Sequence, residues 1–252
     1  MGCCEDKSEA QASNSSLTIA LAGNPNCGKS ALFNTFTGIR QKTGNWPGVT
    51  VDRKQGFFEL DNHLVTAYDL PGIYSLDASS IDEEVTRDYL LSRDADLIIN
   101  VVDAANLERN LYLTAQLLEM GVPIVLVLNM MDVARKRGID IDFKQLSQEL
   151  GCPVVPVVAT SGEGIDQLKQ EILAITSGEH NGGFRLAHDE VVEQAIADLM
   201  PRLEKCSIAA KDNLHWLALK LLESDSNAQD QCGASVLDTV ATWKNAIEER
   251  AG

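Results

Sequence analysis

The sequence lacks the long hydrophobic runs that a membrane-spanning helix requires. Its longest largely apolar stretches, Leu97–Val102 and Val122–Leu128, are far shorter than the roughly 20 residues that cross a bilayer. They are typical of buried strands instead. The hydrophobic fraction of 44% is ordinary for a soluble globular protein. We therefore expect these 252 residues to be soluble and to contain no membrane span.

Positive charge is also scarce. The chain carries 21 lysine and arginine residues against 37 aspartate and glutamate residues, which gives a net charge of −16. A protein that binds extended nucleic acid needs a basic face to neutralise phosphates, and no basic block here is long enough to form one. Nucleic acid is therefore not expected as a partner. A single nucleotide is still allowed, because backbone amides and one lysine are enough to hold it.

Cysteine is sparse and shows no metal-binding pattern. The six cysteines are scattered without CxxC spacing, and the polar, acidic segment Met1–Ser16 is not a secretion signal. We expect reduced thiols in the cytosol. Residues 1–16 are predicted to be a disordered leader, in which the role of Cys3 and Cys4 stays open.

From Leu17 onward, short apolar runs alternate with amphipathic stretches, which is typical of βα units and a mainly parallel sheet. The predicted strands are Leu17–Ala22, Gln55–Leu60, Leu64–Asp69, Leu97–Asp103, Ile124–Asn129 and Val154–Val158. The predicted helices are Ser30–Thr37, Asp82–Leu91, Leu107–Met120, Asp142–Leu150 and Ile165–Thr176. The fold class is therefore α/β with a six-stranded sheet, over residues 17–176.

Strand patterns end at the glycine-bearing break Ser177–Gly183. Beyond it, apolar residues recur at helical spacing in three further stretches, His188–Lys205, Lys211–Ser224 and Ala234–Arg250. Residues 177–252 are therefore predicted to form a small helical bundle. We expect Pro201 to bend or split its first helix, and Trp216 and Trp243 to lie in its core.

One segment carries a phosphate-binding pattern. The octapeptide Gly23-Asn24-Pro25-Asn26-Cys27-Gly28-Lys29-Ser30 fits GxxxxGK[ST] at every defined position, after an apolar strand and before a helix. Its backbone N–H groups are expected to cradle phosphates. Lys29 is predicted to reach the β and γ phosphates, and the Ser30 hydroxyl to ligate Mg²⁺.

Three further segments follow strands in the order that a guanine-nucleotide site needs. Asp69-Leu70-Pro71-Gly72 offers a carboxylate for Mg²⁺ and the Gly72 amide for the γ phosphate. In Asn129-Met130-Met131-Asp132, the Asp132 carboxylate is predicted to accept hydrogen bonds from the N1 and N2 edge of guanine, which adenine does not present. Val158-Ala159-Thr160 offers a backbone amide for the guanine O6.

The loop Gln41–Asp52 has the glycines of a mobile segment and contains Gly48-Val49-Thr50-Val51-Asp52 beside the nucleotide. Thr50 is predicted to ligate Mg²⁺ and to meet the γ phosphate through its amide. The alternative is a threonine that simply begins a strand. Asn26, Lys29, Thr50 and Gly72 are the predicted catalytic set.

Together, the phosphate loop, Asn45-Trp46-Pro47-Gly48-Val49-Thr50-Val51, Asp69-Leu70-Pro71-Gly72-Ile73-Tyr74 and Asn129-Met130-Met131-Asp132 closely resemble the ferrous iron transport protein B (FeoB) family. The resemblance covers about residues 17–176. It implies a Ras-like P-loop GTPase domain, followed by a helical domain linked to GDP binding. It also implies a membrane domain that carries Fe²⁺, expected after this chain, and a place at the cytoplasmic face of a bacterial inner membrane. Small accessory iron-transport proteins and an oligomer stay open as partners.

The sequence departs from the general GTPase pattern at two positions. Met130 stands where the guanine motif usually has lysine, so we expect a weaker grip and faster GDP release. Ile73 stands where Ras-like proteins have the glutamine that orients water. The resemblance implies that K⁺ replaces an arginine finger, held by Asn26 and by the backbone carbonyls of Gly44 and Trp46. The alternative for Asn26 is that it only caps the loop.

The predicted function is a GTP-hydrolysing switch, with ATP open as a secondary substrate. One alternative is a nucleotide-binding regulatory module whose hydrolysis is incidental. Another is a ribosome-associated GTPase of the Era type, which the acidic tail disfavours because RNA binding needs a basic appendage.

Overall fold

The structure is a computed structural model that describes residues 16–38, 40–61, 63–76, 80–178, 188–205 and 214–251. The predicted leader, residues 1–16, lies outside these residues except for Ser16. Most of the predicted break Ser177–Gly183 lies outside them as well.

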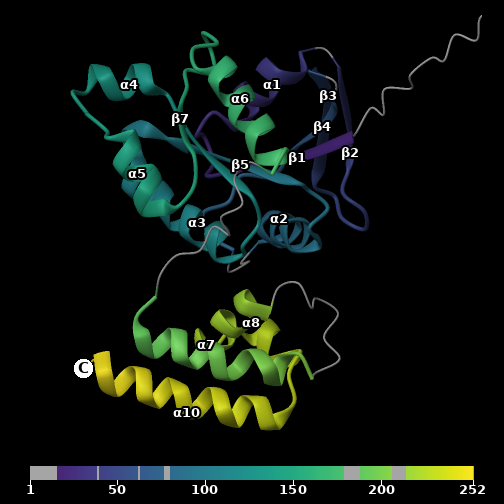
Figure 1. Ribbon diagram of the computed structural model, residues 1–252. Coiled ribbons are helices and arrows are strands. Elements are labelled where there is room, and N and C mark those ends of the chain that lie inside the picture. The colour runs from purple at the N-terminus through teal and green to yellow at the C-terminus, as the bar shows by residue number, and fades with distance from the viewer. Residues whose placement is uncertain are drawn as a thin grey trace, which may run out of the picture.

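One sheet of seven strands organises residues 16–178 (Figure 1). Its order is β2-β3-β4-β1-β5-β6-β7, and every pairing from β4 to β7 is parallel. The strands are β1 Ser16–Gly23, β2 Gln41–Asn45, β3 Asp52–Leu60, β4 His63–Asp69, β5 Leu97–Asp103, β6 Ile124–Asn129 and β7 Val154–Pro156. The α/β class and the mainly parallel sheet are confirmed. The order reverses at β1, which lies between β4 and β5, and ligands of such sheets bind at the carboxyl end of that point.

The prediction of six strands missed β2. This strand is polar and exposed along its whole length, QKTGN, and it pairs only with β3 at the sheet edge. Without a buried face it has no alternation of apolar and polar residues, so the sequence pattern gives no signal for it. β3 and β4 form an antiparallel hairpin, in which Leu60 pairs with His63.

Helices cover both faces of the sheet (Figure 1). Odd-numbered residues of β1, such as Ile19 and Leu21, pack with α1 (Lys29–Thr37) and α6 (Ile165–Thr176). Even-numbered ones, such as Ala20, pack on the other face with α2 (Ile81–Ser92), α3 (Leu107–Glu119) and α5 (Phe143–Leu150). This alternation follows from the period of two in a strand. Both faces are buried, so β5 and β6 read as continuous apolar runs.

The predicted helices are confirmed to within a few residues. Asp142 is the N-cap of α5 and accepts a hydrogen bond from the Gln145 amide. Three short helical elements were not predicted: a 3-10 turn at Ala104–Asn106, α4 at Met131–Lys136 and, in the C-terminal part, α9 at Ser226–Asp230.

The C-terminal part is helical, as predicted. Its helices are α7 Glu190–Leu203, α8 Leu214–Leu222, α9 Ser226–Asp230 and α10 Ala234–Ala251, around a separate apolar core. Pro201 does not split α7, because it lies in the last turn, where its missing N–H and its ring interrupt little of the helix.

The prediction that Trp216 belongs to the core of the bundle is wrong. The indole of Trp216, on α8, packs with the apolar cluster beneath α2 and α3 of the sheet domain. The helical bundle therefore contacts the sheet domain on this side, opposite the face that α1 covers (Figure 1).

Candidate functional site

The phosphate loop leaves β1 at Gly23 and enters α1 at Lys29. Two of its residues, Asn26 and Gly28, have left-handed backbone angles, φ 66° and 85°. At Gly28 a side chain is also excluded by contact, because an added Cβ would lie 2.2 Å from the Nδ2 of Asn129. The loop is therefore tightly curled, and α1 points its N-terminus at the space the loop encloses.

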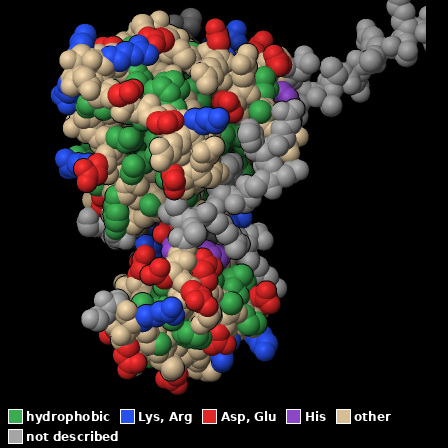
Figure 2. Space-filling view, turned by 60° about the vertical axis from the view of Figure 1, so that its left-hand side comes forward, with side chains coloured by type: hydrophobic (Ala, Val, Ile, Leu, Met, Phe, Trp, Pro, Cys, Tyr) green, Lys and Arg blue, Asp and Glu red, His purple; other side chains and the backbone are tan. Residues whose placement is uncertain are grey.

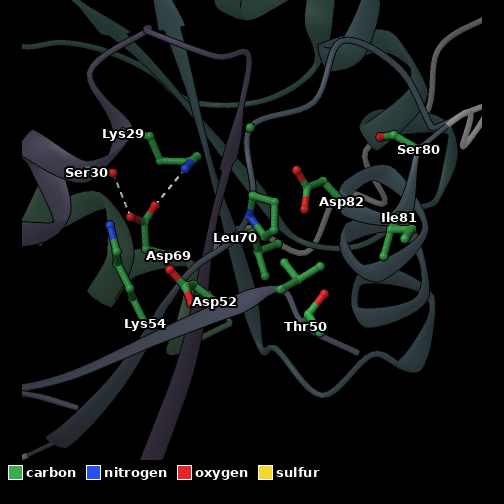
Figure 3. Close-up of a pocket in the computed structure, with 13 residues that line it drawn as sticks. Lys29, Ser30, Thr50, Asp52, Lys54, Asp69, Leu70, Ser80, Ile81 and Asp82 are labelled. Atoms are coloured by element: carbon green, nitrogen blue, oxygen red, sulfur yellow. Dashed lines mark hydrogen bonds and ion pairs between the residues drawn. The ribbon is translucent and has the colours of Figure 1, made fainter. Parts of the chain in front are cut away.

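The Asp69 carboxylate joins the two phosphate-loop side chains that were predicted to act on the nucleotide (Figure 3). Lys29 donates from Nζ to Asp69 Oδ1 at 2.7 Å, and the Ser30 hydroxyl donates to Asp69 Oδ2, also at 2.7 Å. Asp69 ends β4, and β4 lies beside β1 in the sheet. The structure therefore places Lys29, Ser30 and Asp69 together at one edge of the sheet.

The segment after Asp69 is fastened to the phosphate loop by its backbone. Leu70 donates its N–H to Leu21 and Ile73 donates its N–H to Gly23, at 3.1 and 3.2 Å. An added Cβ at Gly72 would lie 3.0 Å from the Cα of Pro25. Gly72 is therefore in close contact with the phosphate loop. This is the region in which its amide was expected to meet the γ phosphate.

Cys27 lies within the phosphate loop and is buried. Burial raises the pKa of its thiol to about 11, against the lowering effect of Lys29. The group is therefore a neutral thiol at physiological pH, and it is not a nucleophile there.

Asn129 connects two loops of the site. Its Nδ2 donates to the carbonyl of Cys27 at 2.9 Å, and its Oδ1 accepts from the amide of Ala159 at 3.0 Å. Since Val158 donates its N–H to Glu163, the amide of Thr160 is the one in this tripeptide without a partner among the described residues. Of the three amides, that of Thr160 is therefore the one available to donate a hydrogen bond to a nucleotide base.

Met130 and Asp132 follow β6. Met130 has a left-handed backbone, φ 60°, and its Cε lies 3.5 Å from the position of a Cβ at Gly28, so the thioether covers the phosphate loop. Asp132 is half-exposed and has Lys136 at 3.8 Å. The neighbouring Met131 is buried and packs in the core, so it does not line the site.

Thr50 lines a cavity of about 690 Å³ together with Lys29, Ser30 and Asp69. Val51, Asp52, Leu70, Pro71 and Gly72 line it too. Gly48, with φ 79°, forms the turn before Thr50, and Val49 is half-buried on the opposite side, against the core. Two contributors were missed from the sequence. One is Lys54, which pairs with Asp69 across the β3–β4 ladder, and the other is the start of α2 at Ser80–Asp82. Lys54 sits at a strand position that no motif marks.

The three residues of the expected K⁺ site are not gathered in one cavity. Asn26 lines a cavity of about 440 Å³ within the phosphate loop, with Asn24 and Pro25. Gly44 lies in β2, and the side chain of Trp46 lines a different cavity beside α2. The K⁺ site stays a prediction.

Comparisons with known proteins cover nearly all of this architecture. Residues 17–172 match the family model for ferrous iron transport protein B, and residues 188–252 match the model for the FeoB cytosolic helical domain. The Fe(2+) transporter FeoB of Escherichia coli K12 is 49% identical over 242 residues, and that of Salmonella typhimurium is 47% identical over 250 residues. Each alignment covers 93% of this chain but 31% of the relative, so the chain spans about a third of these transporters.

Solved structures of FeoB domains resemble this chain in fold. A GDP-bound point mutant of the S. thermophilus FeoB G-domain superposes with a TM-score of 0.82 at 41% identity, covering 92% of this chain and 89% of that one. The cytosolic domain of L. pneumophila FeoB gives 0.76 at 39% identity, covering 90% and 88%. Among the described residues, no helix is both long and apolar enough to cross a membrane. The family models and the solved relatives agree on a Ras-like G domain followed by a helical domain, and the chain belongs to the ferrous iron transport protein B family.

Proposed function

We propose that this chain binds GTP and GDP, hydrolyses GTP, and acts as the nucleotide-dependent regulatory part of a ferrous iron transporter at the cytoplasmic face of a bacterial inner membrane. The observation that carries the proposal is the convergence of Lys29, Ser30 and Asp69 at the carboxyl ends of β1 and β4. The solved relatives bound to GDP support guanine as the base.

The residues present suit Mg²⁺, because Ser30 and Asp69 offer a hydroxyl and a carboxylate oxygen side by side. Thr50, which lines the same cavity, would add a second hydroxyl. When bound there, Mg²⁺ supplies charge neutralisation to the β and γ phosphates.

The chain's own residues would do the rest. The Lys29 ammonium leaves Asp69 and binds the β and γ phosphate oxygens, while the backbone N–H groups of the phosphate loop bind the remaining charge. The amides of Thr50 and Gly72 hold the γ phosphate in line with a water molecule. That water attacks the γ phosphorus, the bond to the β–γ bridging oxygen breaks, and GDP and inorganic phosphate result.

Base selection is assigned to Asp132, with the free amide of Thr160 for the guanine O6. Asn129 holds the two loops that carry these contacts in register, through Cys27 and Ala159. We also propose K⁺ activation. The Asn26 side chain is exposed and makes no hydrogen bond with any described residue, so its oxygen is available to a cation.

The test of the proposal is a base exchange. A carboxylate at position 132 accepts two hydrogen bonds from guanine, whereas an amide would also donate one, which suits xanthine. We expect the Asp132→Asn chain to lose GTP turnover and to gain turnover of XTP, measured as phosphate release with Mg²⁺ and K⁺. Lys29→Ala is the control that should lose both. Equal activity of the natural chain with ATP and GTP would contradict the assignment of Asp132.

A further inference from the structure

The side chain of Trp46 is enclosed by three residues from three different elements, which we call the indole cage: Tyr68 of β4, Tyr89 of α2 and Arg53 of β3. Trp46 meets Tyr89 edge to face, with ring centroids 5.1 Å apart, and Tyr68 at 6.3 Å. The Arg53 guanidinium lies over both the indole and the Tyr68 ring, 5.3 and 4.8 Å from their centroids. Trp46 is 8% exposed, although it sits in the loop between two exposed strand ends (Figure 2 shows one face of the molecular surface).

The cage is itself held in place. Arg53 donates from Nη2 to the Tyr68 hydroxyl at 2.9 Å, and Gln55 donates to the same hydroxyl at 3.2 Å. The rings of Tyr68 and Tyr89 are 5.3 Å apart. The indole therefore enters a site that the surrounding elements have already built.

Two polar atoms oppose this arrangement. The Nε1 of Trp46 and the hydroxyl of Tyr89 are both buried, and neither has a hydrogen-bond partner among the described residues. Buried polar groups are nearly always paired, and leaving one unpaired is costly. A cavity of about 500 Å³ adjoins the cage, lined also by Val49 and Val85, so the rings have room to move. The enclosed position of Trp46 is therefore favoured by apolar and cation–π contact but offset by these two atoms.

The position of Trp46 determines that of Thr50 through the backbone. Trp46 donates its N–H to Val51, and Val49 donates its N–H to Trp46, at 2.9 and 3.3 Å. These bonds close a tight turn with Gly48 in the left-handed conformation. Thr50 lies on this turn and lines the phosphate cavity, so a displaced indole also displaces Thr50.

Tyr89 links the same cage to the other side of the phosphate cavity. The first residues of α2, together with its N-cap Ser80, line that cavity, and Thr86 of α2 donates its hydroxyl hydrogen to the carbonyl of Pro71 at 3.3 Å. The cage thus ties Thr50, on one wall, to the segment that follows Asp69, on the other.

We infer that Tyr89 is a positioning residue for the triphosphate: its ring holds Trp46 in the indole cage and thereby sets Thr50 against the γ phosphate, without touching the nucleotide. The inference rests on the proposed function, because it assigns Thr50 to the γ phosphate. It predicts that loss of the Tyr89 ring weakens the binding of GTP but not the binding of GDP, since GDP has no γ phosphate for Thr50 to meet.

The experiment uses the whole chain with Mg²⁺, labelled with 5-fluorotryptophan, and Trp46→Phe assigns the Trp46 fluorine signal. Tyr89→Ala removes the ring, Tyr89→Phe removes only the unpaired hydroxyl, and Tyr112→Ala on α3 is the matched control at an exposed tyrosine outside the cage. Three quantities are measured: the Trp46 signal, the affinities for GDP and for a non-hydrolysable GTP analogue, and the single-turnover rate.

For Tyr89→Ala we expect a solvent-like Trp46 signal, GDP affinity unchanged within about twofold, and preference for the GTP analogue lowered about fivefold, with a parallel fall in rate. Tyr112→Ala should behave as the natural chain. Tyr89→Phe, which keeps the ring and removes the unpaired hydroxyl, should keep Trp46 enclosed and hold the preference for the GTP analogue at or above the natural value. An unchanged Trp46 signal, or an equal loss of GDP and analogue binding, overturns the inference. If Tyr89→Ala does not fold, Tyr89→Leu replaces it, because leucine keeps apolar volume without the ring. The same results are expected of Tyr89→Leu, and the same results would overturn the inference. Absence of GTP turnover in the natural chain would contradict the proposed hydrolysis but not the role of Tyr89. The Trp46 fluorine signal and the ratio of the two affinities do not depend on hydrolysis.

Discussion

The ammonium of Lys29 and the carboxylate of Asp69 form a buried ion pair, with 2.7 Å between Nζ and Oδ1. Both residues are more than nine-tenths buried. The same ammonium is the group assigned to the β and γ phosphates, and it cannot hold both partners with the same hydrogen bonds. Nucleotide binding therefore exchanges one anion for another at Lys29, and it leaves Asp69 in need of a new cation. Mg²⁺ is the natural replacement, so Lys29 and the metal are coupled through Asp69.

Replacing Asp69 by asparagine should separate these two roles. In EDTA, Asp69→Asn should bind GDP about tenfold more tightly than the natural chain, because a neutral amide competes less for Lys29. With Mg²⁺, GTP turnover should instead fall by about a hundredfold or more, because a metal ligand is lost. Calorimetric titration and phosphate release measure the two effects. Asp52→Asn is the control, since Asp52 lines the same cavity from an exposed position. Weaker GDP binding by Asp69→Asn in EDTA would contradict the exchange.

Met130 covers Gly28 of the phosphate loop with an apolar methyl group, where most GTPases have a lysine. A lysine there would add a charge-assisted hydrogen bond to the loop or to the base. We expect Met130→Lys to release GDP about fivefold more slowly, measured by stopped-flow chase of a fluorescent GDP. Met130→Leu is the matched control for packing without charge. The explanation fails if the lysine and leucine variants release GDP at the same rate.

The sequence was sufficient to predict the sheet edge at which Lys29, Ser30 and Asp69 meet, because each follows a strand with a strong apolar pattern and a defined motif. It did not predict β2 or Lys54, since both depend on which strands pair at an exposed edge. The role of Asn129 was also missed. The motif marks it as part of the base site, but its hydrogen bonds to Cys27 and Ala159 are long-range contacts that no local pattern reveals. Trp216 was misplaced for a related reason, because helical spacing shows that a face is apolar but not which domain covers it.

Asn26 has an exposed side chain in a left-handed backbone position at the mouth of the phosphate loop. If it holds K⁺ where an arginine finger would otherwise act, K⁺ should raise GTP turnover about tenfold or more over choline chloride at equal ionic strength. Asn26→Ala should abolish the increase and leave GDP affinity within about twofold of the natural value. Phosphate release and GDP titration are the measurements. Equal turnover of the natural chain in K⁺ and in choline would remove the K⁺ site.

Glu119, at the end of α3, has a raised pKa. The cause is first its burial and then the charge of Glu223, which follows α8, while His188 and Lys220 act in the opposite direction. A carboxyl group whose pKa is higher in the folded than in the unfolded chain binds more protons when folded. Stability is therefore lost as the pH rises from the ordinary carboxyl range through the raised pKa.

Replacing Glu119 by glutamine removes this titration. At pH 8, Glu119→Gln should be more stable than the natural chain by up to about 1 kcal/mol, a value reduced for the partial exposure of the side chain. The gain should shrink as the pH falls into the ordinary carboxyl range, because Glu119 is then protonated in both states. Urea unfolding from pH 5 to 8 measures it, with Glu108→Gln in the first turn of α3 as the control. A gain that does not vary with pH would contradict the assignment. Because Glu119 belongs to the sheet domain and Glu223 to the helical bundle, replacing Glu223 by glutamine should reduce the same pH dependence only if the two domains stay in contact in solution.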